Sequence, residues 1–250
     1  MKPLAHDQTP PLVAIETSGA SGGVALLLPG GRLVERAIGG PVAPGAKPSG
    51  HGRELLPAID AIVAEAGIAK SDIGAVAVSV GPGSYTGLRI GVTAAKTLAW
   101  ALGCGLAGVP TLEALARDAA AAGLPEGARR VVPVVDARQR EVYCAAFEVA
   151  SGPEGPGLTR AAEDAAMSPE ELASRLRPGD HVLGTGVARL KADNASPAGV
   201  TSADGPTCPR AGTVALMGAE LLAAGERMDV HGAAPVYLRA SEAERKATSG

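Results

Sequence analysis

The same order of segments occurs twice along the chain, and each copy begins with an apolar strand that ends in an acidic residue. In the first copy the apolar run 12–15 ends at Glu16, and a later strand runs into a glycine turn at 81–87. In the second copy the run 131–135 ends at Asp136, and a glycine turn follows another short strand. The shared order is a hairpin with an acidic turn, a helix, a strand and a glycine turn. The sequence therefore indicates an α/β chain built from two related halves.

The glycine turn of the first half lies between a β-branched strand and a long helix. Gly81 and Gly83 open it, Ser84 or Thr86 could cap the helix, and Gly87 closes the block. Free N–H groups at a helix N-terminus can cradle an anion, whereas a tight connection that binds nothing needs the same glycines. The spacing fits neither a Walker A loop, nor a dinucleotide fingerprint, nor a nucleophile elbow. The pattern leaves anion binding and simple chain reversal open.

Glu16 and Asp136 are two carboxylates at equivalent hairpin turns. If both faced one cleft, they could hold Mg²⁺ through water. The candidate anion or nucleotide cleft then consists of Glu16, Thr17, Ser18, Gly81, Gly83, Ser84 and Asp136. Ordinary turn and cap roles are the alternative for the two acids. No metal site is expected, because none of the four histidines lies three to five residues from another His or a Cys.

Composition narrows the class of partner. The chain has 250 residues, of which 46% are apolar and 2% aromatic, and its formal net charge is −3. So few rings for base stacking, without a basic excess, argue against nucleic-acid binding by the chain alone. No uncharged stretch reaches the roughly 20 residues of a membrane span, and residues 1–11 lack the apolar centre of a signal peptide. We expect a soluble, cytoplasmic protein.

Taken together, these segments resemble the TsaB family, the dimerization subunit of the bacterial tRNA threonylcarbamoyladenosine machinery. The resemblance rests on Glu16-Thr17-Ser18, the block 81–89, Asp136-Ala137-Arg138 with Glu141-Val142-Tyr143, and residues 235–239. It implies an α/β fold of the actin-like ATPase (ASKHA) type, with two lobes that each carry a mixed sheet flanked by helices. The expected division is an N-terminal lobe at 1–110, with the partner-binding helices, and a C-terminal lobe at 111–250 with a frayed tail.

The resemblance also implies a role. It points to a non-catalytic subunit, without activity alone, that binds and organises a TsaD-type catalytic subunit. That subunit transfers a threonylcarbamoyl group to N6 of the tRNA adenosine next to the anticodon. A TsaE-type ATPase is the implied third component, tRNA is reached only through the complex, and a homodimer in the absence of the partner is left open.

The catalytic partner carries a feature that this chain lacks. TsaD-type chains hold a metal with two histidines, four residues apart, after the long helix and the short strand that follows it. Alignment through residues 107–110 places Thr111 and Leu115 at those positions. Neither side chain replaces a histidine as a metal ligand. The sequence thus argues against the catalytic role.

The resemblance places the partner interface on two helices of the first lobe, here expected near 54–66 and 88–102. Helical spacing assigns Leu55, Leu56 and Ile59 to the core stripe of the first helix. The candidate interface residues are Leu55, Ala58, Ala61, Ile62, Glu65, Arg89, Thr93, Lys96, Leu98 and Trp100. A merely solvated face is the alternative for these positions.

Glu16 departs from the family pattern, which usually has Asp at this turn. The longer side chain would displace a water-held Mg²⁺ by the length of one methylene group. No cofactor is therefore expected, and weak binding of a magnesium nucleotide is the alternative. The corresponding alternative function is a stand-alone actin-fold ATPase or kinase that uses Glu16, Asp136 and the two glycine turns.

Overall fold

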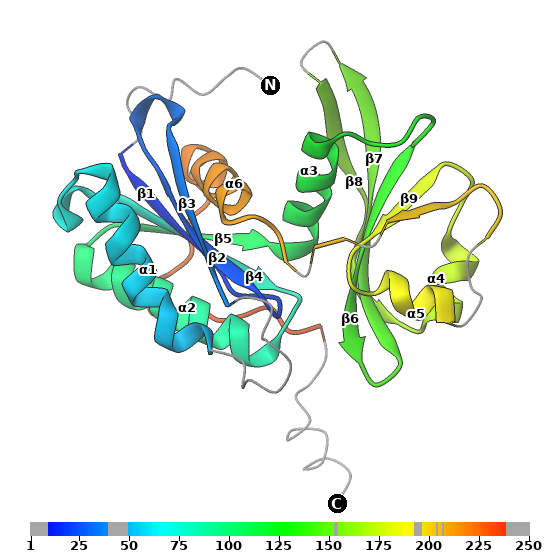
Figure 1. The fold of residues 1–250 in the computed structure, drawn as a ribbon, viewed down its shortest axis with the longest axis horizontal. Coiled ribbons are helices and arrows are strands. Elements are labelled where there is room, and N and C mark those ends of the chain that lie inside the picture. Colours follow the sequence, from blue (N-terminus) through cyan, green and yellow to red (C-terminus); the bar gives the residue numbers. More distant parts are fainter. Residues whose placement is uncertain are drawn as a thin grey trace, which may run out of the picture. The chain divides into compact units, whose positions relative to one another are not determined.

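The computed structural model describes residues 10–39, 50–152, 155–192, 197–203, 205–206 and 208–238. Contacts divide the chain into two compact units. The first takes in the chain up to Leu124 together with Pro206–Pro235, and the second contains Pro125–Gly205. Figure 1 shows that each unit is built around one sheet.

The first unit has five strands and four α-helices in its described part. The strands are β1 (Leu12–Glu16), β2 (Gly22–Leu27), β3 (Leu33–Ile38), β4 (Ala75–Gly81) and β5 (Gly105–Pro110). The helices are α1 (His51–Ala66), α2 (Tyr85–Leu102), α3 (Thr111–Ala122) and α6 (Ala211–Ala223). The sheet order is β3-β2-β1-β4-β5, with β1 antiparallel to β2 and parallel to β4.

The second unit repeats this topology. Its elements are β6 (Arg130–Arg138), β7 (Glu141–Gly152), β8 (Gly155–Met167), α4 (Pro169–Arg175), β9 (Asp180–Leu183), α5 (Val187–Ala192) and β10 (Thr201–Ala203). The sheet order is β10-β9-β6-β7-β8, with β6 antiparallel to β7 and parallel to β9. Each unit therefore places its first strand between its second and its fourth. This confirms the internal repeat and the two mixed sheets that the sequence predicts.

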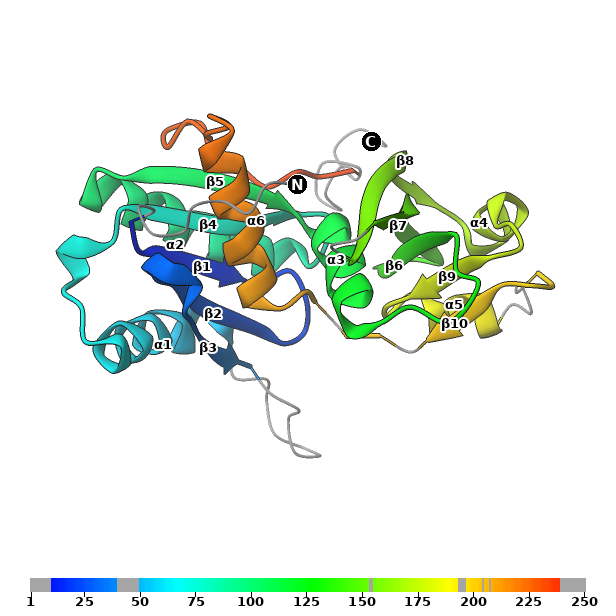
Figure 2. The same ribbon diagram turned by 90° about the horizontal axis from the view of Figure 1, so that it is seen from above.

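Both faces of the first sheet are buried. Alternate side chains of β1 point to opposite faces, so Val13 and Ile15 belong to the core cluster with α1 and α2, while Leu12 and Ala14 belong to the cluster with α6. Figure 2 shows α6 crossing the strands. The continuous apolar runs of β1 and β4 follow from this two-sided burial, which is typical of parallel strands in α/β folds.

The division of the chain differs from the expected boundary between residues 110 and 111. The helix α3 and the distant helix α6 belong to the first unit. The physical reason lies in the second apolar face of the first sheet, which α6 covers by packing on β1, β2, β4 and β5. Gly218 permits this approach, because a Cβ atom there would overlap the Cβ of Ala77. Because α6 comes from a distant part of the sequence, no local sequence feature marks the boundary between the units.

The glycine- and proline-rich stretch 151–157 favours a linker by composition, but it contains the end of β7 and the start of β8. The apolar pattern of residues 235–239 favours a strand, but residues 235–238 form none. Residues 39–50 lack a hydrophobic period, which predicts a loop, and the polar tail after 239 is expected to fray. Residues 40–49 and 239–250 lie outside the described residues.

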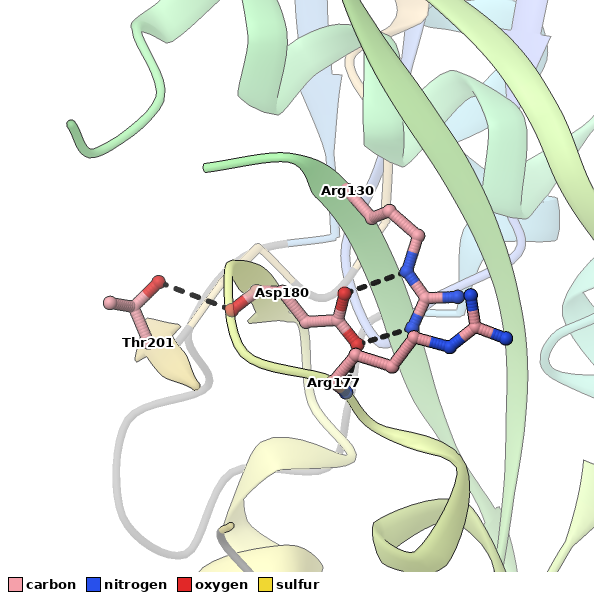
Figure 3. A network of polar contacts seen from close by, with 4 residues as sticks. All are labelled: Arg130, Arg177, Asp180 and Thr201. Carbon is pink, nitrogen blue, oxygen red and sulfur yellow. Dashed lines mark hydrogen bonds and ion pairs between the residues drawn. The ribbon is translucent and has the colours of Figure 1, made fainter. Parts of the chain in front are cut away.

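A buried ion pair holds the strands of the second unit together (Figure 3). Asp180 opens β9 and is 1% exposed. Its carboxylate accepts hydrogen bonds from Nε and Nη2 of Arg130, at 2.7 and 2.5 Å, and from the backbone N–H of Arg177 at 2.7 Å. The Thr201 hydroxyl donates to its carbonyl at 3.4 Å. The bidentate pair therefore connects β6 to β9, and the bond from Thr201 adds β10.

Candidate functional site

Glu16, the first acid of the expected cleft, is fully buried at the end of β1. One carboxylate oxygen accepts hydrogen bonds from the backbone N–H and the hydroxyl of Ser18, at 2.5 and 2.6 Å. The other accepts one from the hydroxyl of Ser79 on β4. Burial raises the pKa of Glu16 from 4.5 to about 7, although the bonds from Ser18 and Ser79 act in the opposite direction. Both oxygens are thus used inside the unit.

The glycine turn between β4 and α2 packs directly against the residues after Glu16. The backbone N–H of Ser84 donates to the carbonyl oxygen of Ser18 at 2.7 Å. The hydroxyl of Thr17 donates to the carbonyl oxygen of Gly87 at 2.8 Å. A Cβ atom at Gly83 or Gly87 would overlap a carbonyl oxygen, of Ser18 and Thr17 respectively. The glycines therefore allow the turn to lie directly against the backbone of Thr17 and Ser18.

The helix cap matches the sequence prediction. The Ser84 hydroxyl accepts from the backbone N–H of Gly87 at 3.2 Å, and α2 begins at Tyr85. With the Ser84 N–H directed to Ser18, part of the expected anion cradle is filled by the chain itself.

Asp136, the second acid, is also engaged within its own unit. Its carboxylate accepts from the backbone N–H of Arg138 at 2.9 Å and pairs with Arg189 on α5 at 3.4 Å. Its own N–H donates to the hydroxyl of Thr185 at 3.1 Å. Gly184 and Gly186 of the second glycine turn lie against the backbone of Val134, where a Cβ atom would not fit. In each half, then, a glycine turn packs closely on the first strand or on the residues that follow it.

These contacts bear on the magnesium and nucleotide hypothesis. A water-held Mg²⁺ needs carboxylate oxygens that face water, and Glu16 presents none. In the parts of the chain that the structure describes, no group of three or more His, Cys, Asp or Glu side chains is arranged to hold a metal ion. The residues at Glu16 therefore do not fit the ion.

An apolar groove of about 800 Å³ lies between α1 and α2 in the first unit. It is lined by Gly52, Leu55, Leu56, Tyr85, Thr86, Arg89, Ile90, Thr93, Ala94, Thr97 and Leu98. Leu56 and Tyr85 are large side chains left 54% and 44% exposed. Exposed apolar side chains gathered in one groove are a mark of a binding surface.

The α2 side of the groove has two parallel ridges at four-residue spacing. The outer ridge of Tyr85, Arg89, Thr93 and Thr97 is exposed, and the inner ridge includes the half-buried Ile90, Ala94 and Leu98. The Thr97 hydroxyl donates to the carbonyl of Thr93 at 2.8 Å, so it is satisfied within the helix. Such ridges are what a second helix packs between.

The ten predicted interface residues lie in different surroundings: some line the groove, some are buried in the core, and others are exposed elsewhere. Leu55, Arg89, Thr93 and Leu98 line the groove, although Leu55 is only 2% exposed. Ala58 and Ile62 lie in the core of the first unit, Ala61 is half-buried and Glu65 is exposed. Trp100 is 68% exposed, outside the groove lining.

Lys96 is engaged by the chain itself. Its ammonium group donates to the carbonyl oxygens of His231 at 3.3 Å and Ala233 at 3.5 Å. Met228 and Val230 of the same segment pack on the core cluster beneath α2. Lys96 therefore fastens the segment after α6 to α2.

Leu56 is the groove residue that sequence reasoning placed wrongly. The buried stripe of α1 is Leu55, Ala58, Ile59, Ile62 and Val63, so Leu56 faces outward and Ala58 inward. The signal was present, because this stripe follows i, i+3, i+4, i+7 and i+8 spacing with Ala58 included. Tyr85 and Ile90 of α2 were also missed as lining residues.

Comparison with known proteins identifies the family to which the chain belongs. The family model of TsaD, described as tRNA N6-adenosine threonylcarbamoyltransferase, matches residues 34–188. The tRNA threonylcarbamoyladenosine biosynthesis protein TsaB of Bacillus subtilis is 31% identical over 242 residues, covering 94% of this chain and 96% of that protein. TsaB of Escherichia coli is 33% identical over 204 residues, covering 80% of this chain and 85% of that protein.

Solved structures that resemble the chain support the same family. A crystal structure from Pseudomonas aeruginosa, of an uncharacterized protein with similarity to peptidase YEAZ, has a TM-score of 0.76 and 30% identity, covering 92% of this chain and all of that one. Two units with one shared strand order, matched over nearly their whole length, define a protein of the actin-like ATPase fold. Within that class, the chain belongs to the TsaB family.

Two further findings bear on the catalytic and membrane expectations. Thr111 and Leu115, which the alignment sets at the histidine positions of TsaD-type chains, lie on α3 and are 1% and 0% exposed. Within the described residues, no helix combines the length and apolar character that crossing a membrane requires.

Proposed function

We propose that this chain is the non-catalytic subunit of a cytoplasmic tRNA threonylcarbamoyladenosine complex. In this role it binds a TsaD-type subunit and organises it for transfer of the threonylcarbamoyl group to N6 of the adenosine next to the anticodon. A TsaE-type ATPase is the proposed third component, and tRNA is held by the complex. The kinship to proteins named for this pathway supports the proposal.

The α1–α2 groove is the observation that carries the partner role. It is apolar, it exposes Leu56 and Tyr85, and its ridges suit a helix. Covering these side chains removes apolar surface from water, which favours association by about 25 cal/mol per Å² before the entropic costs of binding. We therefore place the partner on this groove.

The absence of catalytic activity in the chain alone is part of the proposal. Thr111 and Leu115 offer no imidazole where the TsaD-type metal ligands are expected, and both are buried. The contribution of this subunit is conformational: by docking, it favours the competent arrangement of its partner.

The alternative, a stand-alone ATPase or kinase, has weaker support. It needs Glu16 as a ligand to magnesium, but that carboxylate is buried and hydrogen-bonded to Ser18 and Ser79. Calorimetry of the isolated chain with Mg-ATP decides the matter. Micromolar binding that Glu16→Gln abolishes would favour the alternative.

A reconstituted modification assay tests the proposed function. Purified TsaD-type and TsaE-type subunits, tRNA and threonylcarbamoyl-adenylate are incubated with and without this chain, and modified adenosine is quantified. We expect modification to depend on the chain, and the chain alone to give none. Equal modification in its absence would contradict the proposal.

A further inference from the structure

The charge distribution of the α1–α2 groove specifies its partner more closely than its apolar character does. Among the described residues that line the groove, Arg89 is the only charged one. It stands on the exposed outer ridge of α2, one turn after Tyr85, and the remaining lining residues are apolar side chains, threonines, Tyr85 and Gly52.

Arg89 is held in place by its neighbour. Its Nη1 donates to the Tyr85 hydroxyl at 2.8 Å, and its guanidinium lies over the Tyr85 ring, 5.4 Å from the centroid. A guanidinium has five N–H donors, so most of its donors remain available for a further acceptor. Holding the side chain in advance reduces the entropy lost when such an acceptor binds.

A partner that covers the groove changes the surroundings of this charge. Filling the groove with apolar side chains removes water from Arg89, and a desolvated charge without a counter-ion is costly. Among the described residues, Arg89 has no ion pair with a carboxylate of its own chain. The planar guanidinium matches a carboxylate, which it can bind through two parallel hydrogen bonds.

We propose that the partner segment in this groove is an amphipathic helix whose apolar face carries one Asp or Glu opposite Arg89. The proposal rests on the proposed function, since it takes the TsaD-type subunit as the occupant. The four-residue ridges supply the fit for the helix, and the fixed arginine selects its register. Arg89 is thus a specificity residue for the partner.

Charge reversal tests this inference. The affinity of the TsaD-type subunit is measured by calorimetry for the wild-type chain, Arg89→Glu and Arg227→Glu. Arg227 is an exposed arginine that lines a different pocket, beside α6, and its variant controls for the change in net charge. We expect Arg89→Glu to weaken binding by at least ~30-fold and Arg227→Glu by no more than about 2-fold. Circular dichroism confirms folding.

A rescue experiment identifies the acid. Each Asp and Glu on the partner helix that binds the groove is changed to Lys and combined with Arg89→Glu. We expect one exchange to restore most of the lost affinity, because it re-forms the pair with reversed charges. No rescue by any exchange would overturn the inference.

The outcomes separate this inference from the proposed function. If the wild-type chain fails to bind the partner, both are wrong. If it binds and Arg89→Glu binds as tightly as Arg227→Glu, the inference is wrong and the proposed function stands. If the chain alone forms a dimer that Arg89→Glu dissociates and that the partner does not displace, the occupant is a second copy and the inference is overturned.

Discussion

At the scale of single residues, Glu16 is a carboxylate taken almost completely out of water. Its pKa is about 7 in the folded chain against 4.5 ordinarily, so the folded state binds the proton more tightly than the unfolded state. Its contribution to stability is therefore full below pH 4.5 and is lost as the pH rises through about 7. The loss is on the order of 3 kcal/mol.

This linkage gives the first prediction. The free energy of unfolding of the wild-type chain, minus that of Glu16→Gln, should fall between pH 4.5 and 7 and be flat on either side. Urea unfolding at a series of pH values measures it. Glu65→Gln, at an exposed position on α1, is the control for the loss of one carboxylate. A pH-independent difference for Glu16→Gln would mean that the carboxyl has an ordinary pKa.

The glycine turn gives the second prediction. Gly87→Ala should destabilise the chain by about 1–3 kcal/mol, because the added methyl group overlaps the carbonyl oxygen of Thr17. Gly52→Ala on α1 is the matched control, since its nearest neighbours are 3.9 Å away, and it should be neutral or stabilise the helix by up to about 1 kcal/mol. Equal effects of the two substitutions would show that the turn has room for a side chain.

At the scale of elements, the Arg130–Asp180 pair joins β6 to β9 in the second unit. Asp180→Ala should cost about 3 kcal/mol, because it leaves a guanidinium that is 14% exposed without its counter-ion. Glu171→Gln breaks a pair in which both side chains are about half exposed, and should cost less than about 1 kcal/mol. Thermal unfolding compares them. Similar losses would mean that burial adds nothing to the first pair.

Lys96 distinguishes a role within the chain from the predicted role at the interface. Lys96→Met should increase hydrogen exchange in residues 228–233 by up to about tenfold, because two hydrogen bonds that fasten this segment to α2 are lost. The affinity for the TsaD-type subunit should change little. If Lys96→Met greatly weakens binding of the TsaD-type subunit but leaves hydrogen exchange unchanged, Lys96 acts at the interface and not within the chain.

The elements also show what the sequence could and could not provide. Apolar periodicity predicts α2 with its buried Leu88, Val92, Ala95 and Ala99, since the signal lies within one helix. It misses β8, whose Ala, Glu and Asp residues have little strand propensity and which forms by pairing with β7. The groove depends on how two helices pack on a sheet, so no local pattern contains it.

At the scale of the whole molecule, the two units share a topology and a packing device but present different surfaces. In both, a glycine turn packs closely on the first strand or on the residues that follow it: on Thr17 and Ser18, just after β1, in the first unit, and on Val134, within β6, in the second. The acids that would make such a fold an ATPase are used to hold their own turns. We propose that the first unit binds the partner through α1 and α2.

Docking of the TsaD-type subunit on the α1–α2 groove is tested by measuring its affinity for Leu56→Glu and for Leu216→Glu. Both leucines are exposed, at 54% and 41%, so both variants should fold, but Leu56 lines the groove whereas Leu216 lies on α6. We predict that Leu56→Glu weakens binding at least ~100-fold, as expected for a charge placed in an apolar contact, while Leu216→Glu binds like the wild type. Equal affinities for the two variants would contradict the account.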